Sequence, residues 1–164
     1  MKISKLLATA TVVILAAGCN NNKNMETEVP EISAFHTGKP NVAYEQYFSG
    51  RSWLAPLTSM KELNVPVSNV TFEPGCRNNW HIHHADKGGG QILICTDGRG
   101  WYQEWGKEPQ ELTPGTVVVI PAGVKHWHGA AADSWFSHIA FEAPGEGCSN
   151  EWLEPVDDEQ YPQA

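Results

Sequence analysis

Short segments in which apolar and polar residues alternate run along the chain from about Tyr44 onward, and turn residues separate them. In the stretch PVSNVTFEPG, residues 67–72 divide into two alternating sets. Val70 and Phe72 are the larger apolar side chains of one set, and Pro74-Gly75 ends the run. A period of two is typical of a β-strand that turns one face toward a core. We therefore expect a strand in this stretch.

Further strands are expected at intervals of roughly ten residues. The segments GQILICTDG (90–98) and GWYQEWG (100–106) flank a turn rich in Asp and Gly. GTVVVIPAG (115–123) is a β-branched run closed by Pro-Ala-Gly, and SWFSHIAFEAPG (134–145) ends in another turn. No helical pattern of useful length lies between these segments. The sequence therefore predicts an all-β sandwich or barrel.

The length and charge of the chain narrow the class of protein. A chain of 164 residues suffices for one domain with a hydrophobic core. The formal net charge is −8 and the eleven basic residues are scattered, which argues against nucleic-acid binding because that needs clustered Lys and Arg. We interpret the acidic run at residues 157–159 as part of a solvated tail over residues 148–164.

The N-terminal residues resemble a bacterial lipoprotein signal peptide. Lys2 and Lys5 form a basic start, and residues 6–17 form an apolar run too short to cross a bilayer permanently. The following LAAGC resembles the lipobox, in which cleavage precedes a cysteine that is then acylated, although Ala16 stands where the motif prefers leucine. An ordinary signal peptide followed by an unmodified cysteine is the alternative.

The lipobox resemblance implies an organisation for the first part of the chain. Residues 1–18 would be the signal peptide, and Cys19 would carry a lipid that holds the protein to a membrane of the bacterial cell envelope, outside the cytoplasm. Residues 19–43 begin with a polar, unpatterned stretch and would form a flexible tether.

Three cysteines remain if Cys19 is acylated, and an odd number cannot all pair within one chain. Outside the cytoplasm a disulfide between Cys76 and Cys148 is one possibility, but the sequence does not show that these residues meet. Cys95 lies in an apolar run, and we expect it to be a small buried residue.

Two pairs of histidines follow the pattern His-x-His. Residues two apart share a face of an extended strand, so His81 and His83 project together and His126 and His128 form a second pair. Two such pairs facing into one barrel could converge on a transition metal, because imidazoles bind these ions well. A single His-x-His also occurs on ordinary surface strands.

The spacing around these histidines resembles the two sequence motifs of the cupin family. The first motif corresponds to Gly75, five residues and His81-Ile82-His83, followed by Gln91, six residues and Gly98. The second corresponds to Gly115, Pro121-Ala122-Gly123 and His126, with Ala130 in the place of an asparagine. The resemblance implies an all-β cupin fold, a jelly-roll barrel over residues 44–147, and a homodimer.

A narrower resemblance links NVTFEPGCRNNWHIHH (69–84) and IPAGVKHWHGAAADSWFSHIAFE (120–142) to small manganese-binding cupins. That group includes hydroxynitrile-lyase-like enzymes and cupins related to carboxymuconolactone decarboxylase. The resemblance implies one divalent metal, manganese first and iron, nickel, cobalt or zinc as alternatives, held by His81, His83, Gln91 and His126. It also implies that His138 lines the pocket as a general base. His128 is a second candidate for proton transfer, because histidine titrates near neutral pH.

Two departures from the cupin pattern leave the fourth ligand open. Glutamine replaces the usual glutamate, and seven residues separate His83 from Gln91 where the motif has three or four. Asp86 and His84 are therefore rival ligands. We favour Gln91 because it keeps its spacing to Gly98 and begins a β-branched run, whereas Asp86 lies in a loop that ends in glycines. The longer loop before Gln91 costs little closure entropy. We interpret the three glycines at 88–90 as hinge residues of that loop.

The proposed ligands are all neutral, so the metal would keep its full charge and polarise a bound carbonyl or hydroxyl strongly. This favours proton transfer or carbon–carbon bond cleavage on a small oxygenated organic substrate over dioxygenase chemistry. The alternatives are a non-catalytic cupin that binds a metal or small molecule, and a cupin whose metal only stabilises the barrel. The fold itself does not choose between them.

Overall fold

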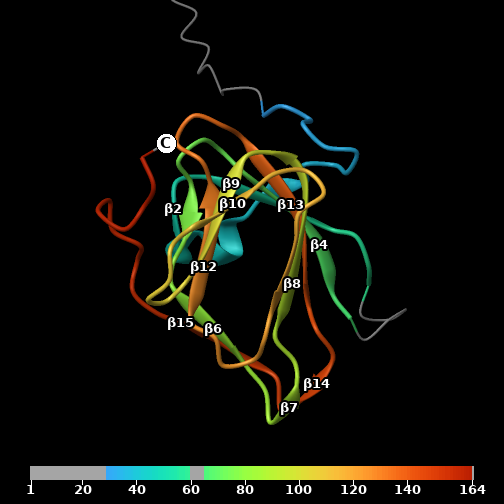
Figure 1. Cartoon of the computed structure of the whole chain (residues 1–164). Helices are drawn as coiled ribbons and strands as arrows, with labels where there is room; N and C mark the ends of the chain where they lie inside the picture. The colour runs from blue at the N-terminus through green and yellow to red at the C-terminus, as the bar shows by residue number, and fades with distance from the viewer. Residues whose placement is uncertain (1–28, 60–64, 164) are drawn as a thin grey trace, which may run out of the picture.

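The computed structural model describes residues 29–59 and 65–163, whose regular structure is almost all β (Figure 1). One layer, sheet A, has six of the described strands in the order β1-β3-β4-β13-β8-β11. Their bounds are β1 (Lys39–Pro40), β3 (Ser52–Pro56), β4 (Val67–Phe72), β8 (Gln91–Gly98), β11 (Val117–Ile120) and β13 (Phe136–Glu142).

The opposite layer, sheet B, has seven of the described strands. Five follow the order β10-β9-β12-β5-β2, and β6 pairs with both β12 and β15. Their bounds are β2 (Phe48–Ser49), β5 (Arg77–Asn78), β6 (His81–His84), β9 (Gly100–Glu104), β10 (Gln110–Leu112), β12 (His126–Ala130) and β15 (Ser149–Trp152). β7 (Lys87–Gly88) and β14 (Gly145–Glu146) form a separate ribbon, and the 3-10 helix η1 (Val42–Tyr47) precedes β2.

The two antiparallel sheets pack face to face, which confirms the predicted all-β jelly-roll architecture. Figure 1 shows β4, β8 and β13 on one side and β2, β9, β10 and β12 on the other. The β7–β14 ribbon lies at one end. Each segment predicted as a strand contains one: 67–72 contains β4, 90–98 contains β8, 100–106 contains β9, 115–123 contains β11 and 134–145 contains β13.

Alternation also explains which side chains form the core. In β8 and β11, Leu93 and Ile120 are 1% exposed and belong to the cluster between the sheets, whereas Val117 and Val119 on the other face of β11 are 55% and 67% exposed. Phe72 and Phe136, from adjacent strands of sheet A, are fully buried in the same cluster. Burial of each large apolar side chain contributes roughly 1.5–3 kcal/mol.

Segments outside residues 44–147 also belong to the barrel. β1 pairs with β3, and the Asn69 side chain donates a hydrogen bond to the His36 carbonyl, so part of the expected tether lies against sheet A. At the other end β15 pairs with β6 inside the expected tail. Val156 and Tyr161 from the same tail pack with Trp80 and Trp127 in a second buried apolar cluster. The folded unit thus extends past both bounds expected from the motifs.

Cys19, with the signal peptide and residues 19–28 of the expected tether, lies outside the described residues, so acylation and attachment to the cell envelope stay predictions. The homodimer stays a prediction too. Among the described residues no helix is both long enough and apolar enough to cross a membrane.

The three cysteines in the described part of the chain are free. Cys76 is buried in the core and Cys148 is exposed, so the disulfide considered between them is not formed. Cys95 is 3% exposed, as expected for a small buried residue, and burial is the main cause that raises the pKa of its thiol to about 12.

Candidate metal centre

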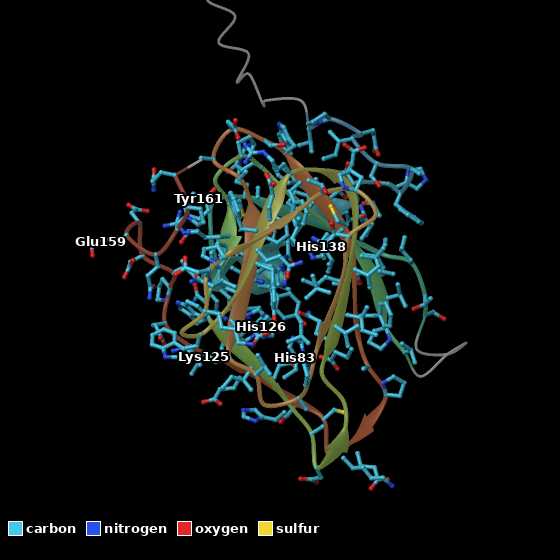
Figure 2. All side chains as sticks on the ribbon, viewed as in Figure 1. His83, Lys125, His126, His138, Glu159 and Tyr161 are labelled. Carbon is cyan, nitrogen blue, oxygen red and sulfur yellow. The ribbon has the colours of Figure 1, made fainter. Side chains whose placement is uncertain are left out.

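Three histidines from two neighbouring strands of sheet B converge inside the barrel. His81 and His83 come from β6, and His126 comes from β12, where it lies directly across from His81 in the antiparallel register. One ring nitrogen from each of these histidines lies within 4.8 Å of the others, an arrangement that could hold a metal ion. Figure 2 places His83 and His126 side by side between the layers.

The side chains of His81 and His126 are held by backbone carbonyls. The Nδ1 atom of His81 lies 2.9 Å from the Asn79 oxygen, and that of His126 lies 2.9 Å from the Val124 oxygen. A carbonyl only accepts, so each Nδ1 carries the proton and each Nε2 keeps its lone pair when the ring is neutral. Both rings are at most 2% exposed.

Burial keeps these rings neutral. It is the main cause that lowers the pKa of His126 to about 4, and it lowers the pKa of His81 well below 6.5, with the charge of His126 as the next cause. A neutral imidazole is the form that binds a metal. The two histidines are therefore ready to act as ligands near neutral pH.

Gln91, the first residue of β8, completes the cluster. Its Oε1 lies 3.2 Å from the Nε2 atom of His126, which as a neutral ring presents a lone pair there. In this orientation the amide oxygen and the ring lone pair are directed at the same position, as two ligands of one metal ion would be. His83 Nε2 is also buried and has no hydrogen-bond partner among the described residues. This donor set, three imidazoles and an amide oxygen, fits a divalent transition metal.

The structure places both rival ligands away from the cluster. His84 is exposed, and its Nε2 lies 2.7 Å from a Glu151 carboxylate oxygen on the outer surface. Asp86 is exposed beyond the end of β6. The glycines at 88–90 have φ values of 64°, 73° and 96°, which favour glycine, and they return the chain to Gln91 at the inner end of β8.

A cavity of about 200 Å³ opens beside the cluster. His81, His83 and Gln91 form part of its polar wall. The remaining wall is largely apolar and aromatic, and it includes Tyr44, Phe48, Leu54, Val70, Phe141 and Trp152. The Trp152 ring lies 4.8 Å from the His81 ring and stacks on Tyr47 at 4.6 Å. A small molecule with a polar head and an apolar body would fit this division.

His128 lines the cavity but does not join the cluster of ring nitrogens. Asn78 holds it at two points: the amide oxygen accepts from the His128 backbone N–H at 2.9 Å, and the amide nitrogen lies 3.0 Å from Nε2. Because that amide nitrogen donates, His128 Nε2 accepts, which requires an unprotonated nitrogen. Burial, followed by the charge of His138, lowers the pKa of His128 well below 6.5.

His138 lies deeper than expected. It was predicted to line the pocket, but it is fully buried and is not part of the cavity wall. Its ring stacks on Phe72 at 5.4 Å and on Phe136 at 5.0 Å, and it lies 4.9 Å from the ring of His128, which lines the cavity. Both of its ring nitrogens lack a hydrogen-bond partner.

Comparison with known proteins agrees with this architecture. A family model described as Cupin domain matches residues 68–136. A protein named (R)-mandelonitrile lyase, from Granulicella tundricola, is 41% identical over 116 residues, which cover 70% of this chain and 86% of the relative. The chain belongs to the cupin family.

Solved structures place this cupin among its relatives. A cupin-like protein from Thermotoga maritima has 40% identity and a TM-score of 0.68, and the match covers 78% of this cupin and 93% of that chain. A DMSP lyase from Ruegeria pomeroyi has 17% identity and a TM-score of 0.51 over 77% of this cupin and 59% of that chain. The second likeness shows the shared fold alone.

Some residues at the site of the cupin were not identified from the sequence. Glu142 lines the cavity and shares strand parity with His138, a signal that could have identified it. The contact with His83 is the largest cause that lowers the pKa of Glu142, and burial opposes it. Asn78, Asn150 and Trp152 also line the cavity, and neither cupin motif includes Asn150 or Trp152.

The buried His138 predicts how the stability of the metal-free cupin depends on pH. Burial lowers the pKa of His138 from 6.5 to about 3, so below pH 6.5 the unfolded chain binds a proton that the folded chain does not. Its contribution to stability is present above that pH and is lost as pH falls. At about pH 4.5 the loss is about 2–3 kcal/mol.

Urea unfolding of chelator-treated protein at neutral pH and at about pH 4.5 measures this term, with His138→Leu as the comparison. The variant should lose about 2–3 kcal/mol less than the parent between the two conditions, because leucine does not titrate. Equal losses in both proteins would show that His138 is not the source.

Proposed function

We propose that this cupin is a metal-dependent lyase that breaks a carbon–carbon bond in a small cyanohydrin-type substrate. The observation that carries the proposal is the convergence of buried lone pairs from His81, His83, His126 and Gln91 beside a cavity whose remaining wall is largely apolar. The 41% identity to a protein named (R)-mandelonitrile lyase supports this class of substrate.

The proposed ligands are His81, His83, Gln91 and His126, and manganese is the proposed metal. All four donors are neutral, so a bound divalent ion would supply Lewis-acid polarisation of a substrate oxygen. His81 and His126 already point their Nδ1 protons at backbone carbonyls, which leaves Nε2 of each ring to bind. Little rearrangement is needed to assemble such a site, and such preorganisation favours tight binding.

The polar and apolar walls of the cavity would orient the substrate. The hydroxyl of a cyanohydrin would lie at the polar wall, and its organic group would pack on the side chains of Tyr44, Phe48 and Trp152. In cleavage, the bond between the carbinol carbon and the nitrile carbon breaks and its electron pair leaves with cyanide. The hydroxyl loses its proton and becomes the aldehyde oxygen, and one proton ends on cyanide as hydrogen cyanide.

His128 is the histidine that we propose to move the proton, because it lines the cavity whereas His138 does not. To accept that proton, its Nε2 would exchange the hydrogen bond that it now accepts from the Asn78 amide for one from the substrate hydroxyl. His138 touches the ring of His128 but not the cavity, so we propose that it positions His128. This role differs from that of a general base in direct contact with substrate.

Mandelonitrile cleavage by the manganese-loaded protein tests the proposed function. The aldehyde and cyanide should form in equal amounts, and His128→Ala should reduce kcat by roughly 10²–10⁴-fold while the bound metal is retained. His84→Ala is the matched control, because His84 is exposed and is not part of the cavity wall, and it should leave turnover unchanged. Bound metal without turnover on any cyanohydrin would instead favour a non-catalytic binding cupin.

A further inference from the structure

The three histidines of the candidate metal centre differ in what holds their outer ring nitrogens. His81 and His126 each contact a backbone carbonyl at 2.9 Å. His83 has no such carbonyl, and its Nδ1 faces the Oε1 atom of Glu142 at 3.6 Å. This distance exceeds that of a hydrogen bond, and within the described part of the chain both buried ring nitrogens of His83 lack a hydrogen-bond partner. A small rotation of either side chain would close the gap.

Glu142 is held in place from the other side. It is the last residue of β13, in sheet A, and its side chain is 37% exposed at the cavity wall. The amide nitrogen of Asn150 donates a hydrogen bond of 2.6 Å to the same Oε1. Asn150 lies in β15, directly across from His83 in the β6–β15 register. Three strands from both sheets therefore bring His83, Glu142 and Asn150 together.

We infer that Glu142, held by Asn150, is a positioning residue that keeps the proton of His83 on Nδ1 and so presents the lone pair of Nε2 to the metal. The inference rests on the proposed function, because it concerns the same metal centre. A carboxylate that accepts from the outer nitrogen of a histidine ligand sets the tautomer and ring orientation and makes the ligand more basic. Backbone carbonyls do this for His81 and His126, and Glu142 does it for His83.

This role also changes the charge of the centre. The four proposed ligands are neutral and leave two positive charges on a divalent metal, but Glu142 adds one negative charge directly behind a ligand. Bound metal is thereby stabilised by a charge that does not occupy a coordination position. Gln91 would supply the coordinating oxygen and Glu142 the negative charge, two roles that a glutamate ligand would combine.

The affinity of the full chain for Mn²⁺ and for Zn²⁺, measured by competition with a chelating dye, tests this inference. Glu142→Ala should weaken binding by roughly 10–100-fold, the range found for outer partners of metal-binding histidines. Glu142→Gln keeps an oxygen that accepts from Nδ1 and should recover part of the loss. Asn150→Ala should lie between the parent and Glu142→Ala.

Glu151→Gln is the matched control. The Glu151 carboxylate also contacts a histidine of β6, His84, at 2.7 Å, but on the outer face of that strand. This substitution should leave the affinity unchanged. A spectroscopic readout comes from the ¹⁵N resonances of His83 in the zinc-loaded protein. In the parent, His83 should show a single form with protonated Nδ1. In Glu142→Ala, the Nδ1 proton should exchange with water fast enough for its signal to disappear.

The outcomes separate this inference from the proposed function. If the parent binds no metal, the proposed function fails. If the parent binds metal and Glu142→Ala and Glu142→Gln bind it equally well, with an unchanged His83 spectrum, Glu142 is not a positioning residue and the proposed function stands. Circular dichroism of each variant checks that a loss of affinity does not come from unfolding.

Discussion

Replacement of His126 by alanine should abolish metal binding at the concentrations that saturate the parent protein. His126 is fully buried at the centre of the cluster, with its ring 4.1 Å from that of His81 and its Nε2 3.2 Å from Gln91. Its loss removes one of four proposed ligands, so the affinity should fall by more than roughly 100-fold, the upper range for residues that act only behind a ligand. Lyase turnover should fall with it.

A chelating-dye competition measures the affinity, and His84→Ala provides the control. His84 is the same residue type one position from His83, but its side chain is exposed and paired with Glu151. Its replacement should leave the affinity for Mn²⁺ unchanged. If His126→Ala and His84→Ala weakened binding equally, the metal would not lie at the buried cluster.

Gly90→Ala should cause the second large loss, in both stability and metal binding. Gly90 has φ +96°, and a Cβ atom there would lie 2.1 Å from the Ile120 carbonyl oxygen and 2.9 Å from the Ala122 nitrogen. The backbone would have to move, and Gln91 is the next residue. We expect a loss of several kcal/mol in the free energy of unfolding, of which the positive φ alone accounts for roughly 1–2 kcal/mol.

Gly115→Ala separates the two contributions. Gly115 has φ +92°, almost the same as Gly90, but nothing lies within 4 Å of a Cβ built there. Its replacement should cost only the conformational strain, roughly 1–2 kcal/mol by urea unfolding, and should leave metal affinity intact. Equal losses in the two variants would mean that the close approach at Gly90 does not position Gln91.

Local patterns in the sequence predicted the strands and much of the metal cluster. Turn residues and β-branched composition identified the segments that contain β8 and β11, which carry Leu93 and Ile120 inward. Strand parity placed His81 and His83 on one face of β6, and both are buried. The glycines at 88–90 lie between β6 and β8 as expected, but Gly88 belongs to the short strand β7, which pairs with β14 and was not predicted.

Contacts between distant parts of the chain could not be predicted in this way. β15 lies in an acidic segment with no strand pattern, and only its pairing with β6 brings Trp152 and Asn150 to the cavity. The depth of His138 also depends on tertiary packing, since parity gives the face of the strand but not the distance from the cavity. Phe72 and Phe136 enclose that ring.

The most direct test of the account is the metal content of the protein after loading with Mn²⁺ and removal of unbound ion, measured by elemental mass spectrometry. We predict one equivalent of metal per chain in the parent and almost none in His126→Ala. Less than a tenth of an equivalent in the folded parent, with manganese or with any other divalent transition metal, would contradict the account.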